Sequence, residues 1–112
     1  MYGHYLVTAR PLSGRMADFE SELSAGAFLG LKPFGRALSA SLRSARWLSN
    51  GISIWEEEDY CRPPLAQERA AVLDQYFEEI TVEPIEQGEG WERIAELPRL
   101  FPGLADPNPS AP

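Results

Sequence analysis

Apolar and polar residues alternate in the first segment of the chain. The run from Tyr2 to Leu12 has a period of two until Pro11 interrupts it, which predicts a first β-strand. Between Arg15 and Ala25, apolar residues recur at helical spacing with acidic residues between them, which predicts an amphipathic helix. The chain is therefore expected to begin with a strand and a helix.

The middle of the chain predicts two more strands. Residues Ala37 to Leu48 alternate Leu and Ala with Ser and Arg, which indicates the second strand. Asn50-Gly51 separates this run from a third strand that begins at Ile52, and this dipeptide favours a tight hairpin. Residues 26–36, before the second strand, combine glycines and a proline with large apolar side chains, so we expect a loop that docks on the core.

A second helix and a fourth strand follow. Arg62-Pro63-Pro64 places proline in the first turn of a helix, and apolar residues at 3.6-residue spacing extend it towards Ile80. The run Ile80 to Ile85 is a short strand whose Pro84 has no N–H for a ladder bond, which predicts an edge position. Trp91 to Leu97 predicts a short final helix.

This order of elements predicts an α+β fold, a ferredoxin-like β-α-β-β-α-β two-layer sandwich with a short C-terminal helix. In such a fold both main helices cover one face of an antiparallel sheet and leave the other face open. We expect one domain over residues 1–101 and a disordered, proline-rich tail over residues 102–112.

The net charge and the distribution of apolar residues indicate which classes of partner the chain can bind. The net charge is −7, and it is uneven: residues 1–55 hold three acids and six bases, a balance of +3, and the rest holds fourteen acids and four bases, a balance of −10. This acidity disfavours nucleic acid, which is bound through clustered Lys and Arg. There is no apolar run of membrane-spanning length and no signal-peptide pattern at the start, so we expect no membrane contact and a cytoplasmic location.

Few residues can carry catalysis. The single cysteine and single histidine exclude a disulfide within the chain and any Cys-Cys or His-His metal site. Cys61 and His4 would lie near one another if the first and third strands are antiparallel neighbours, which makes them a candidate reactive pair, although a buried structural cysteine is the commoner case. We expect no catalytic residue and no cofactor.

The acidic run Glu56 to Asp59 offers oxygen ligands for a divalent metal. On a strand, however, neighbouring side chains point to opposite faces, so at most two of the four can converge. The alternative is a strand end that pairs with Arg43 and Arg46 across the hairpin, and this alternative predicts no metal.

Two surfaces are candidates for a ligand or a partner. If Val7 faces the helices and Ile54 packs inward, then Trp55 points out on the open face, which a second copy of the chain or the final helix would cover. The loop 26–36 offers apolar anchors beside two basic residues. The candidate residues on both surfaces are Phe28, Leu31, Lys32, Phe34, Arg36, Arg43, Trp47 and Trp55.

These features favour a non-enzymatic homodimer that acts as a protein-interaction or small-ligand-sensing module, with a protein or a small apolar ligand as partner. The alternative is a cofactor-independent dimeric α+β barrel enzyme of the monooxygenase or isomerase type, which shares length and element order with this chain. An acidic decoy for a basic protein surface is a third possibility. A pocket among Phe19, Phe28, Phe34 and Tyr76 would favour the enzyme, and a filled core there would favour the module.

Overall fold

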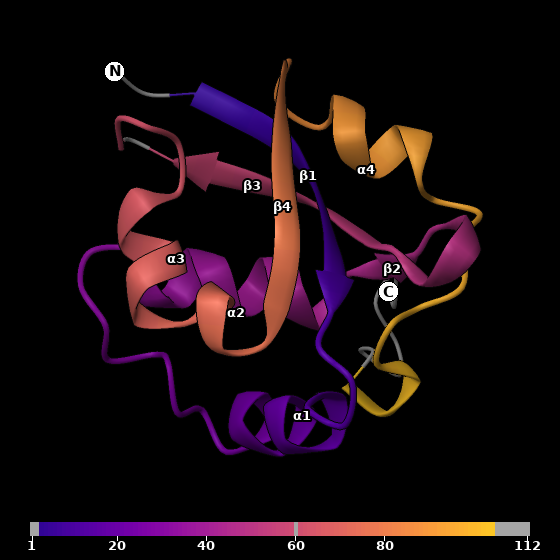
Figure 1. Ribbon diagram of the computed structural model, residues 1–112. Helices are drawn as coiled ribbons and strands as arrows, with labels where there is room; N and C mark the ends of the chain where they lie inside the picture. Colours follow the sequence, from indigo (N-terminus) through magenta and orange to yellow (C-terminus); the bar gives the residue numbers. More distant parts are fainter. Residues whose placement is uncertain (1–2, 60, 105–112) are drawn as a thin grey trace, which may run out of the picture.

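A computed structural model describes residues 3–59 and 61–104 of the chain. Four strands form one antiparallel sheet in the spatial order β2-β3-β1-β4 (Figure 1), with β1 at Gly3–Pro11, β2 at Arg46–Trp47, β3 at Ser53–Asp59 and β4 at Phe77–Ile85. The described helices are α1 (Met16–Ser24), α2 (Gly35–Arg43), α3 (Ala66–Ala71) and α4 (Glu89–Arg93). Together these elements make an α+β fold.

The central strand β1 sets the register of the sheet. Val7 lies opposite Trp55 of β3 on one side and opposite Val82 of β4 on the other. Strand β4 has a neighbour on one side only, so Pro84 lies on an edge strand, as its missing donor predicts. The Asn50-Gly51 hairpin is also confirmed, because β2 and β3 pair antiparallel across it. Asn50 and Gly51 both take positive φ angles in this turn.

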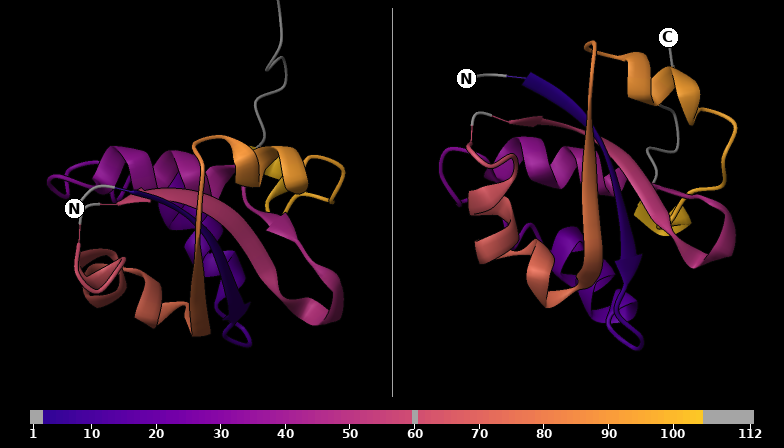
Figure 2. Two further views of the ribbon diagram at one scale, coloured as in Figure 1. Left: turned by 90° about the horizontal axis from the view of Figure 1, so that it is seen from above. Right: turned by 45° about the horizontal axis from the view of Figure 1, so that its top comes forward.

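The two faces of the sheet bury unequal cores. On one face, Val7 and Trp55 join a large buried cluster to which α1 and α2 contribute Phe19 and Leu38. On the other face, Leu6, Ile54 and Ile94 form a small cluster beneath α4. Helix α2 packs along β3: its buried side chains join the large cluster, and its other side lies next to α4 (Figure 2). Of the two covers expected for the second face, the C-terminal helix is the one present, although it spans Glu89–Arg93 rather than 91–97.

The predicted strand over Ala37–Leu48 is wrong. Residues Gly35–Arg43 form α2, and only Arg46–Trp47 remain as strand. Leu38 and Leu42 are four residues apart, a spacing that fits one face of a helix as well as alternate positions of a strand. The segment is rich in Ala, Ser, Leu and Arg and has no β-branched residue, so helix propensity decides between the two periods.

The outward orientation predicted for Trp55 is also wrong. Its side chain is fully buried and packs 5.3 Å from the ring of Phe77, centroid to centroid. Because Trp55 is opposite Val7, both point into the large core, and Ile54 points to the α4 face. The alternation of β3 was ambiguous because this strand buries polar as well as apolar side chains, including Ser53 and Glu57.

The second predicted helix is shorter than its pattern. α3 ends at Ala71, a single 3₁₀ turn follows at Leu73–Gln75, and β4 begins at Phe77 rather than at Ile80. Val72 and Leu73 are nevertheless buried. The helical spacing of these apolar residues therefore predicted correctly that they are buried, but not that the helix continues through them. At the C-terminus, Pro102–Leu104 form one 3₁₀ turn, and the rest of the predicted tail lies outside the described residues.

Candidate functional site

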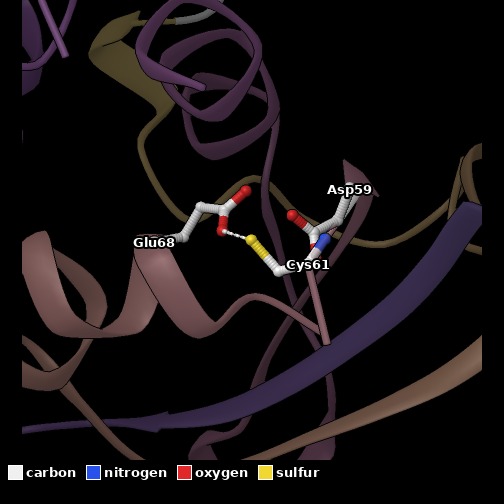
Figure 3. Close-up of side chains that lie close together, drawn as sticks. All are labelled: Asp59, Cys61 and Glu68. Atoms are coloured by element: carbon white, nitrogen blue, oxygen red, sulfur yellow. Dashed lines mark hydrogen bonds between the residues drawn. The ribbon is translucent and has the colours of Figure 1, made fainter. Parts of the chain in front are cut away.

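The end of β3 and the start of α3 bring three ligand-type side chains together. Asp59 is the last residue of β3, Cys61 lies in the connection that follows, and Glu68 is on α3. One ligand atom from each residue, a carboxylate oxygen or the sulfur, lies within 4.8 Å of the other two, and Figure 3 shows Cys61 between the two carboxyl groups. The thiol lies 3.9 Å from Glu68 Oε1. We call these three residues the acid–thiol cluster.

Asp59 organises the backbone around this cluster. Its Oδ2 accepts hydrogen bonds from the backbone N–H groups of Cys61 (3.1 Å) and Leu65. Leu65 has a positive φ of 67°, a conformation that an L-residue adopts at some cost, and its buried side chain anchors the turn into the large core. The carboxyl group is therefore fixed from two sides, and α3 starts at a defined distance from β3.

The cluster is buried and rich in negative charge. Glu68 is 1% exposed and Asp59 is 2% exposed. Burial raises the pKa of Glu68 to about 7, and the hydrogen bond with Asp59 adds to this rise. Burial also acts to raise the pKa of Asp59, but hydrogen bonds from Leu65, Glu68 and Cys61 outweigh it, so the pKa of Asp59 is lowered. Of the two carboxyl groups, Asp59 is therefore the more readily ionised.

The thiol is not activated. Burial raises the pKa of Cys61, and the nearby charges of Asp59 and Glu68 raise it further. A nucleophilic cysteine needs the opposite environment, with positive charge next to the sulfur. The surroundings of Cys61 therefore favour the thiol over the thiolate.

Glu57 is a third buried acid, on the same face of β3 as Asp59. It is 1% exposed, its Oε1 accepts a hydrogen bond from the indole N–H of Trp55 (2.9 Å), and its Oε2 has no hydrogen-bond partner. Burial raises the pKa of Glu57 well above its usual range, and the charges of Glu68 and Asp59 raise it further. The cluster therefore lies in a region of negative potential that no basic side chain of the described residues neutralises.

A small cavity of about 50 Å³ adjoins the cluster. Pro33 and Phe34 of the preceding loop and Ala37 of α2 form its apolar wall, and Cys61 and Glu68 form its polar wall. The space suits an ion or a water molecule rather than an organic ligand.

The predicted loop anchors lie partly buried against the core. Phe28, Leu31 and Phe34 all pack on the large cluster, which supports the expectation that the loop docks there. Lys32 of the loop is exposed, and so is Arg36, which the structure places in the first turn of α2.

A pocket among Phe19, Phe28, Phe34 and Tyr76 was expected for an enzyme, and a filled core was expected for an interaction module. Three of these rings, Phe19, Phe28 and Tyr76, pack on one another. Phe19 stacks on Tyr76 with ring centroids 4.3 Å apart, and Phe28 lies 5.8 Å from Phe19. Trp47, another candidate, is partly buried against the same core. Of the four residues proposed for an apolar pocket, Phe34 alone borders the small cavity described above.

The predicted ion pairs between the acidic run and the hairpin arginines are wrong. Arg43 donates to the carbonyl of Leu23, and Arg46 donates to backbone carbonyls that include those of Ala95 and Leu97. Each arginine therefore supports the backbone of another segment, and three acids of β3, Glu56, Glu57 and Asp59, have other partners.

His4 and Cys61 have different neighbours in the structure. His4 Nδ1 lies 3.6 Å from Glu56 Oε2, on the α4 face. Cys61 has its contacts with Asp59 and Glu68. The cluster also contains Glu68, which the sequence analysis did not select. The spacing Asp59-x-Cys61 was a visible signal, but only the turn into α3 brings the third group to it.

The donor set suits a divalent metal of intermediate softness. Two carboxylate oxygens and one thiolate match the ligands of Zn²⁺, which binds oxygen and sulfur in tetrahedral sites and leaves a fourth position for water where the protein supplies three ligands. Among the described residues, no helix is both long and apolar enough to cross a membrane. Comparison of the chain with protein-family models, curated proteins and solved structures finds no match.

Proposed function

We propose that this protein is a non-enzymatic ligand-sensing module of ferredoxin-like topology whose ligand is a divalent cation of the zinc class. The helices between β1 and β2 and between β3 and β4, with the strand order β2-β3-β1-β4, support the split β-α-β arrangement. The observation that carries the function is the acid–thiol cluster, whose three ligand atoms lie within 4.8 Å of one another on buried, well-anchored elements.

The electrostatics favour a cation over other ligands. Three buried acids, Glu57, Asp59 and Glu68, lie close enough to shift one another's pKa values, and none of them has an ion pair with a basic side chain in the described part of the chain. Glu57 adds a buried oxygen without a partner, which a neighbouring positive charge would stabilise. A bound divalent ion would replace the proton of Glu68 and the thiol proton of Cys61.

Two observations support a sensor rather than an enzyme. The rings of Phe19, Phe28 and Tyr76 pack against one another where an apolar substrate pocket was the alternative. The raised pKa of the Cys61 thiol opposes a nucleophilic role. A site that binds and releases an ion next to the connection between β3 and α3 would instead change the order of that connection.

Association of two copies through the sheet stays a prediction. Helix α4 covers Leu6 and Ile54, so a second copy would have to use the outer side of β4, where Val82 is exposed. Light scattering at micromolar concentration gives the mass in solution. A monomer mass would remove the dimer and leave the cation site unaffected.

The cation site is tested by calorimetric titration of the reduced protein with ZnCl₂ and by the absorption spectrum with Co²⁺. We expect one ion per chain and a thiolate-to-cobalt charge-transfer band in the near ultraviolet. Cys61→Ser should remove the band, and Glu68→Gln should weaken Zn²⁺ binding by at least about tenfold, the cost of one lost ligand. Glu83→Gln, a matched change of an exposed acid on β4, should alter neither result. Absence of the band, or equal binding by Glu68→Gln and wild type, would refute the proposal.

A further inference from the structure

A groove runs between α2 and α4 along β3, on the opposite side of Glu58 from the acid–thiol cluster. It consists of two adjoining hollows of about 420 and 330 Å³, and both are lined by Ser41 of α2 and Trp91 of α4. The α2 side carries only small residues, such as Ala37 and Ala40, so the helix leaves the groove open. Figure 2 shows the two helices at this side of the sheet.

One end of the groove is basic. Arg46 and Arg99 line the first hollow and form a backbone bridge with each other. Arg46 is occupied by carbonyl groups, since its Nη1 donates to Ala95 (2.9 Å) and Leu97 (2.8 Å). The guanidinium of Arg99 has no ion pair within residues 3–59 and 61–104. Two like charges side by side, one of them unpaired, favour an anion at this end.

The other end is acidic. Glu58 lines the second hollow together with His4 and Glu56. The carboxyl group of Glu56 is engaged by the backbone N–H groups of Gly88, Gly90 and Trp91. Glu58 is half-buried, and its carboxyl group has no hydrogen bond or ion pair with the described residues. The two unengaged charges of the groove are thus opposite in sign and lie at opposite ends.

The length of the groove follows from α2. Ala37 lines the acidic end and Ser44 lines the basic end. Seven residues separate them, and a rise of 1.5 Å per residue gives about 10 Å. An extended peptide rises about 3.3 Å per residue, so roughly three residues bridge this distance.

We propose that the groove binds a short zwitterionic peptide of about three residues. Its α-carboxylate pairs with Arg99, its α-ammonium pairs with Glu58, and its middle residue packs against the indole of Trp91. The small α2 side chains leave room for the peptide backbone, and both terminal charges are required for the fit. This site uses none of the three residues of the acid–thiol cluster, but Glu58 also lines the small cavity beside that cluster, so the peptide is tested in the absence of a metal ion.

The proposal is tested with trialanine as the probe, in a buffer that contains a chelator, by two-dimensional NMR of the Trp91 indole N–H. We expect saturable binding at millimolar trialanine. N-acetyl-trialanine and trialanine amide should each bind about fivefold more weakly, the scale of one partly exposed ion pair. The peptide with both ends blocked should bind weakest. Absence of saturable binding, or equal binding by the doubly blocked peptide, would overturn the proposal.

Two variants test which terminus of the peptide each charged residue of the groove binds. Arg99→Gln should abolish the preference for trialanine over its amide and keep the preference over the acetylated peptide, and Glu58→Gln should do the reverse. Arg46 is left unchanged because it holds backbone carbonyls. Arg93→Gln and Glu92→Gln are the matched controls for charge, and both should preserve the two preferences. Variants that weaken all four peptides equally, with no change in preference, would refute the assigned orientation.

Discussion

Two neighbouring acids of β3, Glu56 and Glu57, show how differently the two faces of the sheet accommodate a buried carboxyl group. Glu56 points to the α4 face, where it accepts hydrogen bonds from Gly88, Gly90 and Trp91. Glu57 points to the large core, where it has one donor and one oxygen without a partner. The carboxyl group of Glu56 is satisfied by backbone N–H groups, whereas burial raises the pKa of Glu57 and so favours its protonated form.

The difference has a structural origin. Helix α4 is short, and no side chain at its own N-terminus caps it. The carboxyl group of Glu56, on β3, accepts from the backbone N–H groups there instead and so holds the helix on the sheet. On the other face, Asp59 and Glu68 already raise the negative potential around Glu57. One face therefore uses its acid for architecture, and the other collects acids that are suited to a cation.

Replacement of Glu56 should have the largest effect. Glu56→Ala leaves three backbone donors of α4 without an acceptor, one of them fully buried. We expect a loss of about 4 kcal/mol in the free energy of unfolding, measured by urea denaturation. Gly90→Ala is an independent check, because a Cβ there would lie 2.9 Å from Glu56 Oε1 and from Ile85 Cδ1. A loss below about 1 kcal/mol for Glu56→Ala would show that Glu56 does not hold α4 on the sheet.

A change of pH should alter the stability of the protein through the acids on the face of the large core. The pKa of Glu68 is raised from 4.5 to about 7 in the folded protein, so folding favours its protonated form. That contribution is full below about pH 4.5 and is lost as the pH rises through 7, a decrease on the order of 2 kcal/mol. Asp59 acts in the opposite direction, because its lowered pKa stabilises the fold above 3.8 and the gain is lost on further acidification.

The measurement is the urea midpoint of the metal-free protein between pH 4.5 and 8. Glu68→Gln should flatten the decrease, since the amide keeps the shape of the protonated acid and cannot ionise. Glu56→Gln is the control on the opposite face and should keep the slope. If Glu68→Gln retains the whole slope, another group is responsible for it.

Replacement of Glu57 by Gln should be mild. The amide oxygen can still accept from the Trp55 indole N–H, and the amide resembles the protonated form of Glu57 that burial favours. We expect a change of about 1 kcal/mol or less in the free energy of unfolding. A loss as large as that of Glu56→Ala would mean that Glu57 is ionised and paired in the core.

The sequence predicted β1, α1 and β4 better than the segment from α2 to β3. Strand β1, helix α1 and the edge strand β4 each have a single period and a clear end signal, and all three are present. The spacing of Leu38 and Leu42 fits both periods, and propensity had to decide. The face of Trp55 depends on its register with Val7, which is a long-range property that local alternation does not contain.

The candidate site was predictable only in part. Cys61 was selected as a reactive residue and Asp59 was weighed as a metal ligand, but they were assigned to different chemistry. Glu68 belongs to a helix rich in charged residues, a pattern that predicts an exposed side chain. It is buried because Asp59 holds the turn at Leu65, which sets where the helix begins. Side chains of one site that lie on different elements are joined by the turn between them, which a local sequence pattern does not specify.

The smallest effect should come from the outer surface of α4. Arg93 is 46% exposed and pairs with Glu83 at 3.0 Å and Glu89 at 3.7 Å. Water screens such pairs, so Arg93→Gln should cost about 0.5 kcal/mol, a cost that 1 M NaCl removes. The comparison with Glu56→Ala then separates two sources of α4 attachment, since the buried cap is insensitive to salt and the surface pair is not. A loss for Arg93→Gln that is large and independent of salt would place the attachment of α4 in its surface pairs and weaken the role given to Glu56.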